Sequence, residues 1–234
     1  MRYLVLDSST IINLALNNLL WILEPLRRQY GGEFYITPEV KKEIVDVPLT
    51  IKRFKLEAMQ ILDEITKGNI KIYDKEDLSA ETEELSRIAN QIFIGKKNYM
   101  KVIDEGELSA IVLARKIQAD ALIIDERTTR LLIESPNMLT LLFRKKLHTN
   151  IQVEQKNLKA FAQKAGALPI LRSVELGVAA YEMGILDKYI PQEKRAKKEL
   201  QKELLDGLLW GMKLKGCAVS EKEMEEILKE ELKQ

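Results

Sequence analysis

The sequence predicts an α/β fold built on a central parallel sheet of about five strands. Short apolar runs alternate along the chain with longer stretches of helical periodicity, and such a rhythm implies parallel strands joined by right-handed crossovers. The first four runs are near-continuous rather than alternating, as in strands that are covered on both faces. The expected strands are residues 3–6, 34–36, 70–73, 121–124 and a weaker one at 170–171.

Helical patterns fill the intervals around these strands. They cover residues 10–23, 38–46, 50–67, 79–95, 105–118 and 174–184. Two of the helix starts carry clear signals. Thr37 is a capping residue before Pro38 at a first helical position. Asp104 and Glu107 have the spacing of a capping box, in which each side chain binds the other residue's backbone N–H.

The composition limits the chemistry that the chain can perform. Apolar residues make up 46% of the 234 residues and the net charge is +1, so we expect a globular protein whose contacts with nucleic acid are confined to a local patch. One cysteine, Cys217, and one histidine, His148, exclude disulfide pairs, thiolate metal cages and Ser-His or Cys-His catalysis. An enzyme with this composition would rely on carboxylates and a metal.

The N-terminal sequence shows no charged leader followed by a cleavage site, and the apolar stretch at 11–26 is interrupted by polar residues. These features predict a cytoplasmic protein without membrane contact. We expect a domain over 1–185 with a basic, mainly helical insertion at about 135–167, and a helical C-terminal extension over 186–234.

The two added segments differ in charge. Residues 141–166 contain six basic side chains and one acidic one, whereas residues 186–234 contain eleven of each. The extension has leucines at helical spacing, which predicts two amphipathic helices that dock on the chain's own core or on a partner subunit. Ser220 and Glu223 form a second capping-box pattern, so the last helix should cover 221–232.

Four acidic residues stand where a parallel sheet would gather them. Asp7 and Asp125 follow the expected strands 3–6 and 121–124, and functional residues collect beyond the carboxyl ends of strands where the strand order reverses. Glu43 and Glu107 lie about one turn into helices whose starts could face the same edge. Clustered carboxylates repel each other unless a divalent cation neutralises them, and Mg²⁺ or Mn²⁺ prefers oxygen ligands. The pattern therefore predicts a metal site.

Each acid also has a structural interpretation. Asp7 could cap the helix that follows it, a role that Ser8 or Ser9 could fill equally well. Asp125 could be a turn residue, and Glu107 could serve only as the capping partner of Asp104. Glu43 could be one more charge on a solvent-facing helix surface. The site is favoured because one sheet topology brings all four acids together.

Four segments carry a resemblance to a known family. They are LVLDSSTIINLA around Asp7, ITPEVKKEIV around Glu43, DEGELSAIVLARK around Glu107 and ADALIIDERTTR around Asp125. In their order and spacing the chain resembles the PIN-domain ribonucleases over about residues 1–133, and LPILRSVELGVAAYEMGIL resembles the family's last strand and helix. The resemblance implies a three-layer α/β/α sandwich whose acidic pocket holds one or two Mg²⁺ or Mn²⁺ ions and hydrolyses RNA phosphodiester bonds.

The resemblance also assigns roles to residues of this chain. It makes Asp7, Glu43, Glu107 and Asp125 the catalytic acids, Asp7, Asp104, Glu107 and Asp125 the metal ligands, and Ser8 or Ser9 the hydroxyl that supports the metal or its water. The third acid is a Glu where many members have Asp. Such chemistry needs no histidine, because the metal acidifies its bound water and withdraws charge from the phosphoryl group.

Basic residues suggest where RNA would bind. Arg127 and Arg130 follow Asp125 and could pair with phosphates near the site, although they could also be a solvated helix face. The insertion adds cations suited to holding phosphates without reading bases, namely Arg144, Lys145, Lys146, Lys156 and Lys159.

We expect a metal-dependent ribonuclease in RNA processing or quality control. The alternatives are a toxin ribonuclease of a toxin–antitoxin pair and a non-catalytic PIN-like module that binds RNA or protein. The insertion and the extension argue against a minimal toxin. Expected partners are RNA, a second copy of the chain bound through the helical tail, and an antitoxin-like or RNA-processing protein.

Overall fold

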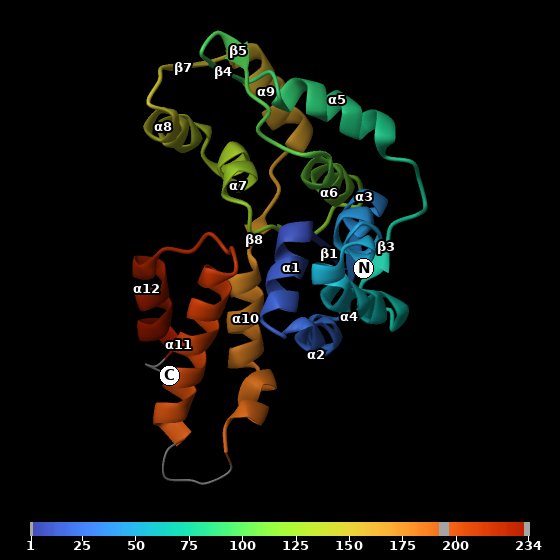
Figure 1. Ribbon diagram of the computed structural model, residues 1–234, viewed down its shortest axis with the longest axis vertical. Coiled ribbons are helices and arrows are strands. Elements are labelled where there is room, and N and C mark those ends of the chain that lie inside the picture. Colours follow the sequence, from blue (N-terminus) through green and yellow to red (C-terminus); the bar gives the residue numbers. More distant parts are fainter. Residues whose placement is uncertain (1, 192–196, 232–234) are drawn as a thin grey trace.

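A computed structural model describes residues 2–191 and 197–231. Its main sheet has five parallel strands in the order β3-β2-β1-β6-β8, with helices on both faces (Figure 1). The strands are β1 (Arg2–Leu6), β2 (Gly32–Ile36), β3 (Lys71–Ile72), β6 (Ala121–Ile123) and β8 (Ile170–Leu171). The predicted α/β class and parallel sheet are confirmed.

The strand order reverses at β1, which lies between β2 and β6. Leu6 at the end of β1 pairs with Ile123 at the end of β6, so the two carboxyl ends lie side by side. The N–H of Asp7 continues this ladder by donating to the carbonyl of Ile123 at 2.9 Å. This edge of the sheet is the one at which ligands bind in open α/β folds.

Alternate residues of the strands enter two separate hydrophobic cores. Leu4 and Leu6 of β1 pack into one core, and Val5 packs into the other. The first core is closed by α1 (Ser8–Leu16), α2 (Leu23–Tyr30), α4 (Lys55–Thr66) and α10 (Ser173–Glu182). The second is closed by α5 (Ser79–Ala89), α6 (Glu105–Lys116) and α7 (Arg127–Glu134). Burial on both faces explains the near-continuous apolar runs of the strands.

Three expected helices are wrong in part. The helix expected at 10–23 ends at Leu16, because Asn18 adopts a left-handed backbone conformation, and the chain resumes as a 3₁₀ turn, η1 (Leu20–Ile22), before α2. The helix expected at 38–46 begins as α3 (Pro38–Lys41) and continues as a π-helical segment, η2 (Lys42–Asp46). The helix expected at 50–67 is preceded by two 3₁₀ turns, η3 (Pro48–Thr50) and η4 (Lys52–Phe54).

A second, antiparallel sheet was not predicted. The helix expected at 79–95 ends with α5, and β4 (Phe93–Gly95) pairs with β5 (Asn98–Tyr99) and with β7 (Ile151–Val153). The side chain of Asn90 fixes this change of direction, because its carbonyl oxygen accepts from the N–H of Val102 at 2.7 Å and its amide donates to the carbonyl of Ile103 at 3.1 Å.

The insertion belongs to this second sheet. It contains α8 (Pro136–Leu147), β7 and α9 (Gln155–Ala165). We call β4, β5, β7, α8 and α9 together the hairpin lobe. The lobe lies at the opposite end of the molecule from the C-terminal helices (Figure 1). Phe93 and Phe143 meet edge to face inside it, with ring centres 5.3 Å apart.

The C-terminal extension docks on the chain's own core. After a 3₁₀ turn, η5 (Ile185–Tyr189), α11 (Lys197–Leu214) and α12 (Glu221–Glu231) lie beside α10 (Figure 1). Leu205 and Leu209 of α11 are fully buried. At Gly177 of α10, a Cβ atom would come within 2.6 Å of the Met212 side chain, so the glycine permits the close contact between the two helices.

The last helix is confirmed in position and in its start signal. The Ser220 hydroxyl accepts from the N–H of Glu223 at 3.2 Å, and the Glu223 carboxylate accepts from the N–H of Ser220 at 2.8 Å. Val219 and Met224 are both buried beside this box. Position 232, the expected end of the helix, lies outside the described residues.

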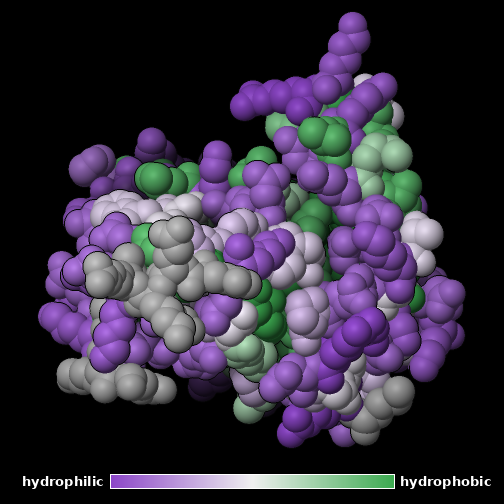
Figure 2. Space-filling model, turned by 90° about the horizontal axis from the view of Figure 1, so that it is seen from below, coloured by the Kyte–Doolittle hydropathy of each residue, from purple (hydrophilic) through white to green (hydrophobic). Residues whose placement is uncertain are grey.

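The surface seen from the end that carries the C-terminal helices is mainly hydrophilic, with hydrophobic residues in small patches (Figure 2). Within residues 2–191 and 197–231, none of the helices combines the length and the apolar character that a membrane crossing requires.

Candidate active site

Asp7 is the most deeply buried acid at the carboxyl edge of the sheet. It caps α1, and its Oδ2 accepts from the Ser9 N–H at 3.0 Å and from the Ser9 hydroxyl at 2.6 Å. Its other oxygen, Oδ1, is buried and has no hydrogen-bond partner among the described residues. Burial raises the pKa of Asp7 to about 6, although the bonds from Ser9 oppose the shift. An unpaired buried carboxylate oxygen is costly in the absence of a cation.

The two serines after Asp7 have different surroundings. The Ser9 hydroxyl accepts from the N–H of Asp125 at 3.0 Å while it donates to Asp7, so it joins the loops that follow β1 and β6. Ser8 lies beside Glu43 and lowers the pKa of that carboxyl. Ser9 therefore supports Asp7 directly, and Ser8 supports the acid on the neighbouring element.

Glu43 reaches the edge from the π-helical segment η2. Its carboxylate lies over Gly106 in the first turn of α6, where a Cβ atom would come within 2.5 Å of Glu43 Oε1. Only glycine allows this approach. The pKa of Glu43 is raised by partial burial of the carboxyl and by the charges of Asp104 and Glu105. Irregular π-helical turns within helices are frequent at functional sites.

Glu107 combines a structural and an electrostatic role. Its Oε2 accepts from the N–H of Asp104 at 2.7 Å, which completes the predicted capping box. Burial raises its pKa to about 8, and the charges of Asp7, Glu126 and Asp104 add to the shift. Glu107 is thus the capping partner of Asp104 and also a member of the acidic group around Asp7.

Asp125 does not join this group. Both of its carboxylate oxygens are bound by Ser173 at the start of α10, Oδ1 by the N–H at 2.7 Å and Oδ2 by the hydroxyl at 2.6 Å. Its pKa is raised by burial, while the bonds from Ser173 and Cys217 oppose the shift. The side chain of Asp125 thus faces Ser173 of α10, and its expected role beside Asp7 stays a prediction.

Glu126, the residue after Asp125, lies near Glu107. It caps α7 by accepting from the N–H of Thr129 at 2.6 Å, and its charge raises the pKa of Glu107. Sequence reasoning missed this residue. The available signal was that adjacent side chains at a strand end point in opposite directions, so Asp125 and Glu126 could not both face Asp7.

Asp104 is on the rim of the site. It is exposed at the start of α6 and forms an ion pair with Lys101, whose ammonium lies 2.5 Å from its carboxylate. A solvent-exposed acid with a lysine partner has less need of a metal than the buried acids have. Its expected role as an auxiliary ligand stays a prediction.

We call Asp7, Glu43, Glu107 and Glu126 the acid group. None of its members forms an ion pair with a basic side chain in the part of the chain that the structure describes. The charge of Glu43 raises the pKa of Asp7, and the charges of Asp7 and Glu126 raise the pKa of Glu107. In the same part of the chain, no three Asp, Glu, His or Cys side chains converge closely enough to hold a metal ion as they stand. The donor set is entirely oxygen, which suits a hard divalent cation. The buried, unpartnered Oδ1 of Asp7 and the raised pKa of Glu107 fit such an ion, whose binding would require the flexible Glu side chains to turn inward.

Arg127 and Arg130, the two arginines expected to bind RNA near the site, differ in exposure and in their contacts. Arg127 is exposed at the start of α7. Arg130 is half-buried, and its guanidinium lies 3.5 Å from the carbonyl of Ala218 in the turn between α11 and α12. Arg127 is free to contact a phosphate, whereas Arg130 also contacts the C-terminal extension.

Arg172 is a further residue that the sequence did not single out. It binds Glu175 in α10, and it reaches the carbonyl of Ala218 at 2.9 Å and Glu223 of α12 at 3.1 Å. These contacts attach the turn between α11 and α12 to the start of α10, beside the bonds between Ser173 and Asp125. The extension therefore closes the side of the sheet edge on which Asp125 lies.

Comparison with known proteins agrees with the geometry. Residues 3–141 match the model of the DUF3368 family, which is described as a PIN domain. No curated protein and no solved structure was found to match the chain.

Proposed function

Because the chain belongs to the PIN-domain family, whose fold is nuclease-like, we propose that it is a Mg²⁺- or Mn²⁺-dependent ribonuclease that hydrolyses RNA phosphodiester bonds in RNA processing or quality control. The observation that carries the proposal is the acid group at the adjoining ends of β1 and β6. Asp7 is buried and Glu107 is half-buried, and both have raised pKa values and no ion-paired cation among the described residues.

The chain's own residues would prepare the site. Asp7 presents its unpaired Oδ1, and the bonds from Ser9 hold its other oxygen in place. Glu107 accepts from the N–H of Asp104, and Glu43 lies over Gly106, so both side chains start at the edge from which they would turn toward an ion. A divalent ion, when bound, supplies the positive charge that lets these carboxylates ionise together and acidifies a bound water. Arg127 is placed to contact a neighbouring phosphate of the RNA.

Cleavage assays with purified protein test the proposal. We expect structured or single-stranded RNA to be cut in Mn²⁺ or Mg²⁺, and cutting to stop with EDTA. Asp7→Asn should reduce the rate by at least about 100-fold, since general acid–base and metal-ligand groups contribute on that scale. Glu203→Gln, which neutralises an exposed acid on α11, is the matched control and should cut normally.

The products and the variants distinguish the candidate functions. Hydrolysis that leaves 5′-phosphate and 3′-hydroxyl ends supports the proposal. Folded wild-type protein that binds RNA but cuts none of the substrates would instead support a non-catalytic RNA-binding module. Cutting that survives both EDTA and Asp7→Asn would contradict the assignment of the site.

A further inference from the structure

The tip of the β4–β5 hairpin holds two lysines in a costly conformation. Gly95 pairs with Asn98, so Lys96 and Lys97 form a two-residue turn, with φ values of 51° and 70°. Positive φ at both positions is the geometry of a type I′ turn, which favours Asn-Gly. The left-handed backbone conformation costs about 1–2 kcal/mol for a residue that has a side chain. Strained residues that persist in a fold point to a function.

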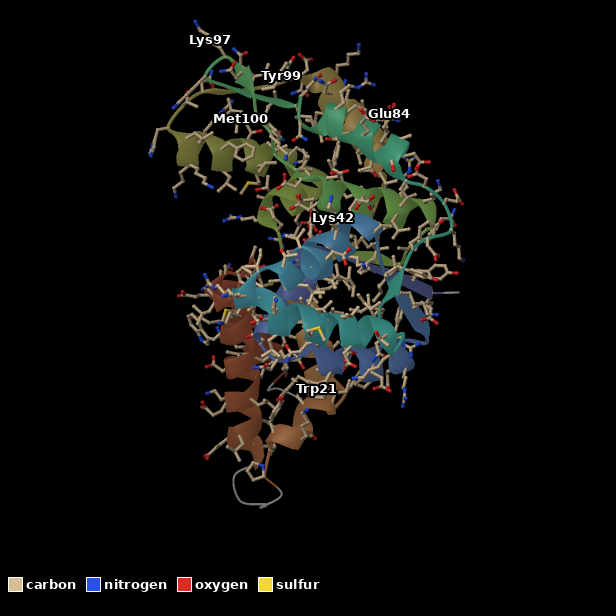
Figure 3. All side chains as sticks on the ribbon, turned by 45° about the vertical axis from the view of Figure 1, so that its right-hand side comes forward. Trp21, Lys42, Glu84, Lys97, Tyr99 and Met100 are labelled. Carbon is tan, nitrogen blue, oxygen red and sulfur yellow. The ribbon has the colours of Figure 1, made fainter. Side chains whose placement is uncertain are left out.

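Protection of the sheet edge does not explain why lysines occupy both positions of this turn. Lysine on an edge strand discourages pairing with other chains, but that role could be filled within β5 without left-handed strain. Lys96 and Lys97 are both exposed, and Lys97 points away from the body of the molecule (Figure 3).

The fold brings further cations to the same tip. Gly95 also pairs with Ile151, so the turn lies next to the segment between α8 and β7. Arg144 near the end of α8 donates to the carbonyl of Ile151 at 3.2 Å, which fixes that helix end beside the hairpin. We call Lys96, Lys97, Arg144, Lys145 and Lys146 the basic tip.

The whole hairpin lobe is strongly positive. Residues 90–101 and 135–167 contain nine basic side chains and one acidic one, in a protein with a net charge of +1. Lys101 and Lys164 are paired with Asp104 and Glu84. The other cations of the lobe form no ion pair with any residue that the structure describes. A concentrated, unneutralised positive surface is typical of contacts with nucleic-acid phosphates.

Two features next to the basic tip suit unpaired bases. Tyr99 follows the turn and is 54% exposed, which leaves its ring open to stacking. A groove of about 630 Å³ lies between α8 and β7 and is lined by Arg144 and by the side-chain amides of Asn137, Asn150, Gln152 and Gln155. Side-chain amides can hydrogen-bond to the base edges that single-stranded RNA exposes.

We propose that the basic tip and Tyr99 form a second RNA-binding site that takes single-stranded RNA. The cations bind its phosphates, and Tyr99 stacks on one of its bases. The inference rests on the proposed function, because the RNA held at this site would be the substrate of the proposed nuclease.

A turn variant tests the role of the lysines. Lys96→Asn combined with Lys97→Gly removes two charges and provides the preferred turn sequence, so the thermal midpoint should stay equal or rise. Binding of a labelled single-stranded RNA should weaken, and the slope of log K against log salt should become smaller by about 1.4, at about 0.7 for each lost phosphate contact. The matched control, Lys52→Gln with Lys55→Gln, removes two exposed lysines outside the lobe and should leave the slope unchanged.

A second variant tests stacking. Tyr99→Ala should lower the affinity for single-stranded RNA by about 5-fold to 150-fold, since a stacked base contributes about 1–3 kcal/mol. It should change the affinity for a duplex of the same sequence little. Equal binding of the duplex and the single strand by the protein with Tyr99 intact would overturn the single-strand assignment.

All of these measurements use the Asp7→Asn protein in EDTA, so they do not depend on catalysis. Tip-dependent RNA binding, together with failure of the wild type to cleave any RNA in Mn²⁺ or Mg²⁺, would refute the nuclease and uphold this site. An unchanged salt slope in the turn variant, or unchanged affinity in Tyr99→Ala, would overturn the site and leave the nuclease proposal intact. Binding of an acidic polypeptide in place of RNA would also overturn it.

Discussion

Replacing Glu107 by glutamine should make the metal-free protein more stable at high pH. Glutamine keeps the shape of the side chain and can still complete the capping box with Asp104, so the substitution isolates the effect of the charge. The wild-type carboxyl is held in a place that disfavours ionisation, because it is buried and lies near Asp7 and Glu126. The folded protein therefore binds its proton more tightly than the unfolded chain does.

The pKa of Glu107 gives the size and the sign of the effect. It rises from 4.5 to about 8 on folding, and a shift of that size corresponds to at most about 5 kcal/mol at about 1.4 kcal/mol per unit. Partial solvent exposure of the residue reduces this to about 1–3 kcal/mol. Between pH 4.5 and 8 the folded state holds more protons than the unfolded state, so wild-type stability falls as pH rises through this window. The glutamine variant lacks this dependence.

Thermal unfolding in EDTA at a series of pH values measures the difference. We expect the variant to melt about 3–10 °C higher than the wild type above pH 8, and the difference to vanish near pH 4.5. Addition of Mn²⁺ should stabilise the wild type and have less effect on the variant. A variant that is no more stable than the wild type at high pH would refute the account of a strained, unpaired carboxylate.

Three further substitutions test other parts of the site. Glu126→Gln should lower the cleavage rate by about 100-fold or more. Unchanged cleavage would show that Glu126 is not the fourth acid of the site. Gly106→Ala should displace Glu43 and slow cleavage at least tenfold while unfolding stays within about 1 kcal/mol of the wild type, because alanine favours the helix; equal rates would show that Glu43 has room to move. Arg172→Met should lower the free energy of unfolding in urea by about 2–3 kcal/mol at neutral pH, since it leaves Glu223 without its partner. That loss should shrink as pH falls from 4.5 towards 2, because Arg172 helps hold the pKa of Glu223 near 2, and a loss that is constant with pH would contradict the ion-pair explanation.

The main sheet could be predicted because its information is local. Each strand is a short apolar run that is buried on both faces, and caps such as Thr37 and Asp104 mark the helices between them. The second sheet depends instead on pairing across a long stretch of chain. Phe93 pairs with Val153, and neither three-residue strand has a pattern of its own that distinguishes it from a helix end.

The acid group shows the same limit at the level of single side chains. Asp7 and Glu107 could be placed from the strand and the capping box that hold them. The choice between Asp125 and Glu126 depends on Ser173, which starts helix α10 beyond the matched family region and offers Asp125 two hydrogen bonds. The spacing of residues along the sequence does not reveal that Ser173 is the partner of Asp125.

The attachment of α11 and α12 sets the smallest piece of this chain that can be expected to fold. The family region ends at residue 141, yet the edge strand β8 and helix α10 follow it, and Met212 and Met224 share a core with Leu4 and Leu6 of β1. A fragment cut after the family region would lose one edge of the sheet, and a fragment cut at 185 would expose the apolar face of α10. Truncation experiments should therefore retain residues through 231. A shorter fragment that lost activity would have lost it by unfolding, so the result would say nothing about the catalytic residues.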